Sequence, residues 1–532
     1  MSDVPPDIAA GWRERGLWSE ETLADSFAAV AAAFPETPLI ASDARGETRK
    51  TLGDVFVRAS RLAAGFAAMG LRPGAVIAVQ MPARLEALIT HAAAALAGLT
   101  VLPVIHIYGP HELDFILAQS GAQAVVAPDH WRGVDYVDRV RQAPAGRRLP
   151  LIVAGKGGPD MIDWRALADS APIDAPIKVD ADALAYLVYT SGTASRPKGV
   201  MHTHRSWMAE LRTTFVPADR QGMHFSPWPP GHVAGLLGFC RYWVLGLPMV
   251  ILDHWDGREA ARLVATHRVT ATQGTPFHLT TMLDAADADG RDLSSLVDYQ
   301  AGATPVPPAV TERCTRLGLR IYRAYGMTEH PTVTRGTPDD PLEKRLTDGA
   351  PCPGVEVRIV DDAGQDLPTG VEGEILARGP ERFAGYLDPA ANEGVILVDG
   401  WLRTGDVGRL DPDGYLRITD RKKDIIIRGG ENISSREVEE LVAGMEPVAE
   451  VAAIGAPDQR FGERVCVFVV LKPGKALTID EIAARFQTQG VARQKTPELL
   501  RIVEALPRNA SGKVVKQDLR AALGPAQDTA AA

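Results

Sequence analysis

The sequence has few of the features that mark disulfide-rich, metal-binding or nucleic-acid-binding proteins. Its 532 residues include only four cysteines, which are widely spaced and form no CxxC pair. They therefore predict neither a disulfide framework nor a zinc site, but small buried side chains in a reducing compartment. The net charge is −10, and no run of Lys and Arg is present. The chain thus has no basic surface of the kind that binds nucleic acid or an anionic membrane.

No hydrophobic run is long and unbroken enough to predict a membrane span. The first residues, MSDVPPDIAAGWRERG, contain no apolar signal core. Residues 87–108 and 233–252 are mostly apolar, but glycine and proline interrupt both, and they contain His91, His106 and Arg241. A buried helix that runs through a turn into a buried strand explains each stretch better. We therefore expect no transmembrane segment and a cytoplasmic protein.

What is present is an ordinary globular composition in a chain too long for one core. Hydrophobic residues make up 45% and charged residues 23% of the sequence, and a chain of this length usually forms at least two domains. Helix-like and strand-like segments alternate as far as about residue 400, as in doubly wound α/β domains. Leu62, Phe66 and Met69, for example, share one helical face, and residues 76–79 then form a predicted buried strand.

The last part of the chain has a different, α+β pattern. Strands are predicted at 415–419, 451–454 and 465–471, and capping boxes are predicted at Ser434 with Glu437 and at Thr478 with Glu481. The charged segment 420–424, DRKKD, lies between two strand-like runs. We place a domain boundary there, which gives domains of residues 1–420 and 421–532.

The most informative local feature is the segment 189–199, YTSGTASRPKG. An apolar strand, 184–189, leads into hydroxyl-bearing and glycine residues and then into Lys198. Such a loop can surround phosphate oxygens with backbone N–H groups and hydroxyls, while the lysine neutralises their charge. The spacing differs from GxxxxGK[ST], so this is not a Walker A loop. Taken alone, the segment fits an exposed turn equally well.

Further short motifs follow in a fixed order over more than 300 residues. They are GATP at 302–305, YGMTE at 325–329, WLRTGD at 401–406, DRKKD at 420–424, GGEN at 429–432 and PRNASGK at 507–513. In this order they resemble the signature motifs of the adenylate-forming superfamily, which includes acyl-CoA synthetases, aryl-CoA ligases, luciferases and the adenylation domains of peptide synthetases. The resemblance covers nearly the whole chain. It implies a large N-terminal domain of doubly wound α/β subdomains plus a small distorted β-barrel, and a small mobile α+β C-terminal domain.

The resemblance also implies a nucleotide site. Tyr325 would stack on adenine, Thr328 would contact the α-phosphate, and Glu329 would hold Mg²⁺, which prefers oxygen ligands. Asp406 and Arg421 would bind the ribose hydroxyls. The residues predicted in this way to bind ATP or AMP are Thr190, Ser191, Gly192, Thr193, Lys198, Gly302, Ala303, Thr304, Tyr325, Gly326, Thr328, Asp406, Arg421 and Lys513.

By the same resemblance, Lys513 is the central catalytic residue, and Thr328, Glu329 and His232 are predicted to assist it. Its charge would stabilise the negative charge that develops as pyrophosphate leaves. The pattern around Lys513 also resembles the acetylation target of bacterial acyl-CoA synthetases, so a lysine acetyltransferase is a predicted partner. Lys423 matches the hinge of the family, and the predicted coenzyme A contacts are Gly429, Gly430 and Glu431.

The segment 228–238, WPPGHVAGLLG, matches the acid-binding segment of the family. Relatives that activate amino acids carry an aspartate near the position of His232, so amino acids are disfavoured as substrates. Ala234 and Gly238 replace larger side chains, which predicts room for a bulky apolar acid: alicyclic, aryl, or medium- to long-chain aliphatic. The predicted acid pocket is His232, Val233, Ala234, Gly238, Gly302, Gly326 and Met327.

Two departures from the family pattern stand out. Ala194 and Ser195 replace the commoner Thr-Gly of the phosphate loop, so we expect altered ATP affinity. Ile-Ser-Ser after Asn432 replaces the commoner Ile-Tyr-Pro and weakens the prediction of the coenzyme A site.

The resulting hypothesis is an ATP- and Mg²⁺-dependent ligase that converts a carboxylic acid to an acyl-adenylate and then to a coenzyme A thioester. The alternatives are an adenylating ligase that loads a separate carrier protein, a luciferase-like oxidation of the adenylate, and a non-catalytic nucleotide-binding protein. The last is disfavoured because the charged residues at 198, 329, 406, 421 and 513 are all present.

Overall fold

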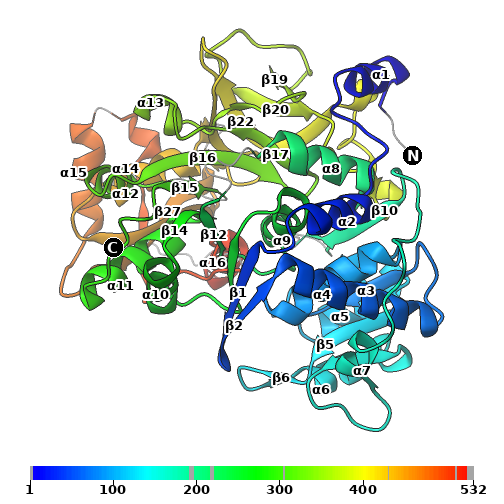
Figure 1. Ribbon diagram of the computed structural model, residues 1–532. Coiled ribbons are helices and arrows are strands. Elements are labelled where there is room, and N and C mark those ends of the chain that lie inside the picture. Colours follow the sequence, from blue (N-terminus) through cyan, green and yellow to red (C-terminus); the bar gives the residue numbers. More distant parts are fainter. Residues whose placement is uncertain are drawn as a thin grey trace.

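The computed structural model describes residues 4–190, 197–215, 221–302, 306–428, 431–489, 491–509 and 512–523. The large N-terminal part contains two extended, mainly parallel sheets (Figure 1). The first has nine strands in the order β18-β17-β16-β15-β14-β12-β13-β1-β2. Its strands are β1 (Pro38–Asp43), β2 (Gly46–Thr51), β12 (Met223–Ser226), β13 (Met249–Leu252), β14 (Val269–Gly274), β15 (Asp298–Ala301), β16 (Arg320–Met327), β17 (His330–Arg335) and β18 (Ala350–Pro351).

The second sheet has eight strands in the order β21-β11-β10-β4-β3-β5-β8-β9. They are β3 (Val76–Val79), β4 (Thr100–Pro103), β5 (Ala124–Pro128), β8 (Leu151–Ala154), β9 (Ile162–Asp163), β10 (Leu184–Tyr189), β11 (Gly199–Thr203) and β21 (Gly385–Tyr386). A short hairpin, β6 (His130–Trp131) with β7 (Val134–Asp135), stands apart from it.

Alternate residues of each sheet face different hydrophobic cores, because successive side chains of a strand point to opposite faces. Leu39 on β1 and Ile77 on β3 belong to one core between the two sheets, which also contains residues of α2, α3, α4, α8 and α9. Ile40 faces a second core under α10, α11 and α12, and Ala78 faces a third under α5 and α6. The large domain is therefore layered α/β/α/β/α, as the doubly wound α/β prediction requires.

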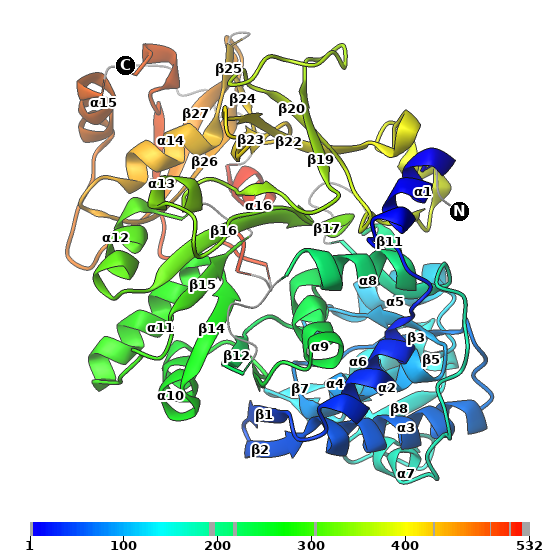
Figure 2. The same cartoon turned by 45° about the horizontal axis from the view of Figure 1, so that its top comes forward.

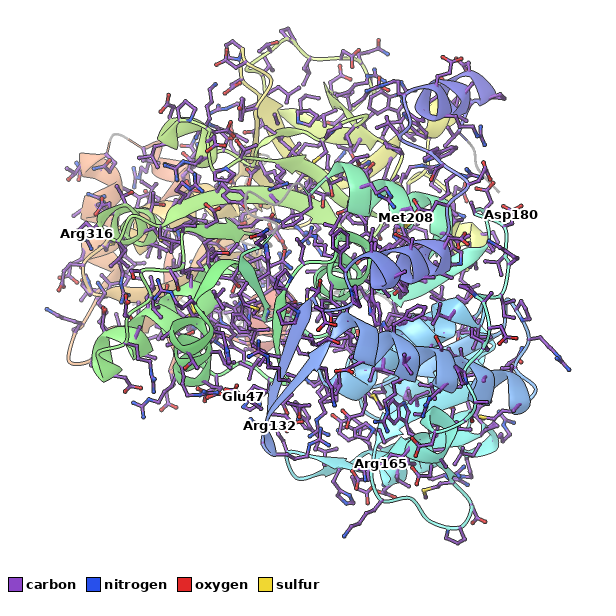
Figure 3. All side chains as sticks on the ribbon, in the orientation of Figure 1. Glu47, Arg132, Arg165, Asp180, Met208 and Arg316 are labelled. Carbon is purple, nitrogen blue, oxygen red and sulfur yellow. The ribbon has the colours of Figure 1, made fainter. Side chains whose placement is uncertain are left out.

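The helices of these layers are α2 (Leu23–Ala33), α3 (Leu52–Ala68), α4 (Leu85–Leu96), α5 (Pro110–Ser120), α6 (Tyr136–Gln142), α8 (His204–Thr213), α9 (Val233–Leu245), α10 (Gly257–His267), α11 (Pro276–Asp289) and α12 (Pro308–Arg316). Three further helices are α1 (Pro6–Glu14), α7 (Trp164–Ala168) and α13 (Leu342–Arg345). Figure 3 shows side chains filling the space between these elements, with Met208 of α8 inside and Arg165 and Arg316 at the outer surface.

An antiparallel sheet forms the third part of the large domain, where the small barrel was expected. Its order is β19-β20-β22-β23. The strands are β19 (Glu356–Val360), β20 (Gly373–Arg378), β22 (Leu402–Leu410) and β23 (Leu416–Arg421). One hydrophobic cluster joins this sheet to β16 and β17 through Ile375, Leu416, Tyr325 and Val333. The strand that ends in Arg421 is thereby held beside the end of β16.

The C-terminal part is a separate α+β unit with its own core. Its elements are β24 (Ile426–Arg428), β25 (Glu431–Ile433), α14 (Ser435–Ala443), β26 (Val448–Asp458), β27 (Gly462–Leu471), α15 (Ile479–Thr488), β28 (Leu499–Ile502) and α16 (Lys516–Ala522). It lies beside the β14–β16 part of the large domain in both views (Figures 1 and 2). The chain passes from the last strand of the antiparallel sheet to β24 between Arg421 and Ile426, next to the proposed domain boundary.

Most of the predicted elements are present where the sequence placed them. The strands predicted at 76–79 and 184–189 have those bounds, and the capping box of Thr478 with Glu481 is complete. At Ser434 the prediction was half wrong. The Ser434 hydroxyl accepts from the backbone N–H of Glu437, but the Glu437 carboxylate binds Lys495 Nζ, 2.6 Å away.

The two apolar stretches that resemble membrane spans each fold as a buried helix followed by a buried strand, α4 with β4 and α9 with β13. Within the described residues, no helix combines the length and apolarity needed to cross a bilayer.

Candidate active site

The carboxyl ends of the parallel strands in the nine-stranded sheet gather the predicted site residues. In open α/β sheets this edge is where ligands bind. Gly302 follows β15, and its N–H donates to the carbonyl of Gly274 at the end of β14 over 3.0 Å. Among the described residues, an added Cβ at Gly302 would make an ordinary van der Waals contact, 3.8 Å from the Ala324 carbonyl oxygen.

Tyr325, Asp406 and Arg421 form one connected group. The Tyr325 hydroxyl donates to Asp406 Oδ2 over 2.6 Å, and Arg421 Nε lies 3.1 Å from Oδ1 of the same carboxylate. Asp406 and Arg421 are partners in the β22–β23 register, so backbone pairing fixes their relative position. Burial raises the pKa of Tyr325 well above its ordinary value, and the adjacent Asp406 carboxylate adds to this shift. The group is therefore an aromatic ring with a carboxylate and a guanidinium beside it.

Glu329 lies in the turn between β16 and β17 and is 7% exposed. Burial raises the pKa of its carboxyl group, although the Tyr386 hydroxyl, which donates to Oε1 over 2.6 Å, and the charge of Lys198 act in the opposite direction. Lys198 Nζ lies 4.8 Å from the centre of the Tyr386 ring. Tyr386 thus joins the lysine of the phosphate loop to the carboxylate predicted to hold Mg²⁺.

The turn that carries Thr328 is held by contacts that leave little freedom. His202 Nε2 lies 2.7 Å from the backbone carbonyl of Thr328. An added Cβ at Gly326 would lie 1.9 Å from the carbonyl oxygen of Pro331, so only glycine fits between β16 and β17 at this position. Met327 is paired with His330 across the same turn.

The segment that presents Lys513 is a closed hairpin. The backbone N–H of Lys513 donates to Asn509 Oδ1 over 2.9 Å, and the N–H of Asn509 donates to the Lys513 carbonyl over 2.9 Å. Arg508 adds a bond from Nη1 to the Gly512 carbonyl over 2.5 Å and another from Nη2 to Glu450 over 2.8 Å. Gly512 has a φ of +77°, a conformation that favours glycine.

This hairpin is docked against the large domain. Gly512 faces Thr275 and His278 at the start of α11, and the Arg508 guanidinium lies 5.4 Å from the ring centre of Phe277. Burial lowers the pKa of Lys513 to about 7, with Arg421 acting in the same direction and Asp406 against it. These interactions place the lysine among the charges of the Tyr325, Asp406 and Arg421 group.

His232 lies at the start of α9, where it is the N-cap residue, and burial lowers the pKa of its imidazole to about 4. Its Nε2 is buried and has no hydrogen-bond partner in the described part of the chain. A neutral imidazole with one unsatisfied nitrogen can donate a hydrogen bond to a bound carboxylate. Val233 and Ala234 follow it in the first turn of the helix, and Gly238 lies one turn further on.

Several predicted residues cannot be placed. Ser191, Gly192, Thr193, Ala194, Ser195, Ala303, Thr304, Gly429 and Gly430 lie outside the described residues. Thr190 is placed, and its N–H donates to the carbonyl of Lys198 over 3.0 Å, which closes the base of the phosphate loop.

Two predicted residues lie close to the connection between the two parts of the chain. Lys423 lies in the turn between β23 and β24, where its carbonyl accepts from Arg520 Nη2 over 3.5 Å and its amine interacts electrostatically with Arg421 and Asp406. Glu431 is exposed at the β24–β25 hairpin, paired with Arg428. No hydrogen bond or ion pair between described residues joins Glu431 to Asp406, Arg421 or Lys513.

Sequence reasoning missed Tyr386 and His202, and it included Asn509 only as one member of the 507–513 motif. In the structure Tyr386 bonds to Glu329, His202 to the Thr328 carbonyl and Asn509 to the backbone of Lys513. A lone Tyr or His has no local pattern that distinguishes it from a core residue, so only the fold identifies these two.

The donor set around Glu329 fits Mg²⁺ held mainly by a nucleotide. The described residues contain no cluster of three or more His, Cys, Asp or Glu side chains suited to a metal ion. Mg²⁺ usually binds through one or two carboxylates together with phosphate oxygens and water. A single buried carboxylate beside Lys198 is consistent with that mode and with no dedicated protein cage.

Comparison with known proteins gives two family matches. The family model described as "AMP-binding enzyme" matches residues 27–387, and the model described as "AMP-binding enzyme C-terminal domain" matches residues 437–513.

Similar full-length proteins are also known. A medium-chain fatty-acid–CoA ligase of Escherichia coli (strain K12) is 34% identical over 530 residues, which covers 96% of this chain and 92% of the relative. The 3-[(3aS,4S,7aS)-7a-methyl-1,5-dioxo-octahydro-1H-inden-4-yl]propanoyl:CoA ligase of Rhodococcus jostii (strain RHA1) is 36% identical, with 90% and 94% covered. The o-succinylbenzoate coenzyme A synthetase of Bacillus subtilis, solved with ATP and magnesium ion, superposes with a TM-score of 0.79 at 26% identity and covers 94% of this chain and 100% of its own.

Proposed function

The chain belongs to the family of AMP-binding enzymes, and from this membership we propose that it is an ATP-dependent carboxylic acid–CoA ligase. The reaction has two steps: carboxylate and ATP give acyl-AMP and pyrophosphate, and acyl-AMP and coenzyme A then give acyl-CoA and AMP. The observation that carries the proposal is the docking of Lys513 beside Asp406 and Arg421. Lys513 of the C-terminal unit thus meets the pair predicted to bind ribose, Asp406 on β22 and Arg421 on β23, as adenylation requires.

In the first step the protein supplies position and charge rather than a nucleophile. Tyr325 offers a flat face for the base, and Asp406 and Arg421 offer an acceptor and donors for ribose hydroxyls. His232 Nε2 can hold the attacking carboxylate. Protonated Lys513 stabilises the charge that builds up as the bond to pyrophosphate breaks.

Glu329 is the residue that would hold Mg²⁺, and Lys198 would contact the phosphates. When bound, Mg²⁺ supplies Lewis-acid charge neutralisation on phosphate oxygens. The hydrogen bond from Tyr386 favours the ionised form of Glu329, whereas burial raises the pKa of its carboxyl group and favours the neutral acid.

For the second step we assign Lys423 as the hinge and the 429–431 segment as the coenzyme A contact. Lys423 lies in the short connection between the antiparallel sheet and β24, which supports the hinge assignment. Glu431 stands exposed and apart from the nucleotide group, so a rotation of the C-terminal unit would be needed to bring it to an acyl-adenylate. The same connection, which lies between the end of β23 at Arg421 and the start of β24 at Ile426, supports a domain boundary close to 420–421.

The acid is proposed to be bulky: alicyclic, aryl, or medium- to long-chain aliphatic. Ala234 and Gly238 on α9 leave space next to His232. The E. coli and R. jostii relatives are named for a medium-chain fatty acid and a fused-ring propanoate. An alternative acceptor is a separate carrier protein, which would receive the acyl group on its own thiol.

Two further proposals concern setting and regulation. The four cysteines are all buried and free, which supports a reducing compartment, the cytoplasm. Acetylation of Lys513 would remove the charge that adenylation uses.

The test is AMP release from Mg·ATP with a panel of carboxylic acids, in the presence and absence of coenzyme A. Acid-dependent AMP formation that needs coenzyme A for turnover supports the ligase. A stoichiometric burst of pyrophosphate that coenzyme A does not convert to turnover favours a carrier protein. No AMP or pyrophosphate with any acid would contradict the proposal.

A further inference from the structure

A cavity with a polar end lies beside the elements that carry the predicted acid pocket, and it shares Gly238 with that pocket. The cavity lies between α9 and strands β12, β14, β15 and β16, and encloses about 50 Å³ accessible to water. Its lining includes Ser226, Gly238, Arg241, Gln273 and Gln300. The aromatic and aliphatic side chains of Phe225, Leu247, Met249 and Tyr322 complete the walls. An apolar body with a polar end is the shape of ligand that such walls accept.

The cavity is aligned with the expected acid site. Ala234, Gly238 and Arg241 occupy positions i, i+4 and i+7 of α9, which is one face of a helix. His232 begins this helix, and the rise of 1.5 Å per residue puts Gly238 about 9 Å and Arg241 about 13 Å along the axis from it. On the helical face that starts at His232, the two small residues Ala234 and Gly238 thus precede Arg241.

The strands give the same alignment. Gln300 lies on β15, two residues before Gly302, which follows the strand. Gln300 pairs with Tyr322 of β16. Because strand side chains alternate, Gln300 and Gly302 face the same side of the sheet, about 7 Å apart. The predicted nucleotide and acid sites meet at Gly302. The cavity therefore begins two residues before that position, at Gln300.

The polar groups at the far end are buried and incompletely satisfied. Ser226 is 4% exposed and Arg241 is 6% exposed. Within the described residues, Ser226 Oγ, Arg241 Nε and Gln300 Oε1 have no hydrogen-bond partner. Arg241 makes one side-chain bond, from Nη1 to Gln273 Oε1 over 3.0 Å, and stacks 4.1 Å from the ring centre of Phe215. Buried donors without partners are costly, so this cluster is suited to a ligand that accepts from them.

The charge of the cavity favours an acceptor. Arg241 and Arg335 both line it, and neither forms an ion pair with a described residue. The carboxylate in the lining is that of Asp298. It forms an ion pair with Arg320, in which Nε lies 2.8 Å from Oδ1. Glu210 is not part of the lining, but it interacts electrostatically with both arginines, and its Oε1 accepts from Thr332 over 2.7 Å. Burial lowers the pKa of Arg241 to about 10, so it stays protonated at neutral pH.

We propose that the acid activated by this enzyme carries a hydrogen-bond-accepting oxygen, a ketone carbonyl or a second carboxylate, roughly 10 Å from the carboxyl group that is adenylated. Arg241 and Ser226 bind this oxygen at the polar end of the cavity. An added Cβ at Gly238 would lie 2.3 Å from Ser226 Oγ, so a larger residue at this position would displace the hydroxyl. The inference rests on the proposed ligase function and narrows its substrate class.

The test compares three acids of equal length: decanoate, 9-oxodecanoate and decanedioate, each assayed for coenzyme A-dependent AMP release. The expected result is a kcat/KM at least about tenfold higher for one of the oxygen-bearing acids than for decanoate, the effect of one hydrogen bond to a charged donor. Preference for the oxo acid identifies a neutral carbonyl, and preference for the diacid identifies a carboxylate.

Two variants then locate the preference. Arg241→Gln and Ser226→Ala should each lower the ratio of kcat/KM between the preferred acid and decanoate toward one. If Arg241→Gln folds poorly, Ser226→Ala still tests the inference. Its fold should be less affected, because the Ser226 hydroxyl makes no internal hydrogen bond among the described residues. Ser295→Ala is the matched control, since Ser295 Oγ is likewise buried and unpartnered but lies outside the cavity, and its ratio should equal that of the wild type.

Equal kcat/KM for the three acids, or a preference for decanoate, would overturn the inference and would mean that water alone satisfies these groups. A preference that survives both Arg241→Gln and Ser226→Ala would also overturn it. If no acid gives AMP here or in the wider panel, the proposed function itself fails, and the inference with it.

Discussion

Replacing Lys513 with alanine should separate the two half-reactions. Lys513 comes from the C-terminal unit and reaches the charges of Asp406 and Arg421 in the docked arrangement. Its protonated amine is needed while pyrophosphate leaves, but attack of a thiol on a finished acyl-adenylate creates no charge at that place. We therefore expect Lys513→Ala to lose adenylation and to keep most of its reaction with acyl-adenylate and coenzyme A.

The size of the loss follows from the role of the amine. Removing one well-placed donor to developing negative charge typically costs about 100- to 1000-fold in rate. Docking without nucleotide lowers the pKa of Lys513 from 10.5 to about 7. A change of this size makes protonation of the docked lysine about 5 kcal/mol less favourable. Phosphate charge must offset that penalty, so the lysine becomes fully effective only with ATP present.

The pH dependence has a definite sign. Because the lowered pKa disfavours the charged amine, the nucleotide-free docked form is destabilised as pH falls from 10.5 toward 7, and below 7 the full penalty applies. The negative charge of bound phosphates is expected to raise the pKa of Lys513 again. Adenylation by the wild type should therefore decline on the alkaline side with an apparent pKa above 7, and Lys513→Ala should lack this decline.

The assay measures pyrophosphate release for the first half-reaction and acyl-CoA formation from a preformed acyl-adenylate for the second. Lys475→Ala is the control from the same domain. Lys475 forms an exposed 2.9 Å pair with Glu446, and such pairs contribute about 0–1 kcal/mol to stability. Equal losses in both half-reactions, or less than tenfold loss in the first, would refute this account of Lys513.

Three other substitutions test the rest of the site. Tyr386→Phe removes the 2.6 Å hydrogen bond to Glu329, which should raise the carboxyl pKa further, move the acid limb of activity to higher pH and raise the Mg·ATP requirement about tenfold. Asp406→Asn should raise KM for ATP about tenfold or more with a smaller effect on kcat, because a charged acceptor is lost. Gly326→Ala forces a Cβ to 1.9 Å from the Pro331 carbonyl, and the free energy of unfolding should fall by about 3 kcal/mol in urea titrations.

Each of these has a result that contradicts it. An unchanged pH profile in Tyr386→Phe would separate Tyr386 from Glu329, and an unchanged KM for ATP in Asp406→Asn would remove Asp406 from the nucleotide site. Gly11→Ala is the control for Gly326→Ala. Gly11 lies in α1 with nothing within 4 Å of an added Cβ, so alanine should be neutral or stabilise by up to about 1 kcal/mol.

Local signals predicted the elements well. Strand 184–189 and the Thr478 cap each depend on residues that are close together in the sequence. Both are present as predicted. The second half of the Ser434 cap failed because Lys495, 58 residues away, competes for the Glu437 carboxylate. Local propensity cannot register a partner that only the tertiary fold supplies.

The site shows the same division. The spacing of YGMTE and WLRTGD placed Tyr325 and Asp406 in motifs, but their hydrogen bond depends on the packing of two sheets. The prediction of an apolar acid used Ala234 and Gly238 alone. Helical periodicity predicts that Arg241 lies on the same face one turn later. It does not predict that Arg241 is buried at the end of a cavity.

The hairpin that carries Lys513 has a mechanical consequence. Its two strands are tied to each other by Asn509 and braced by Arg508 against Glu450 within the C-terminal unit. If the C-terminal unit rotates in the second step as proposed, Lys513 withdraws together with it. Such a rotation has to release Arg508 from Phe277 and Gly512 from α11, and also the hydrogen bonds of Ser435 to Asp420 and of Arg436 to the Ile418 carbonyl. One segment of the chain can in this way take part in one reaction and be withdrawn for the next.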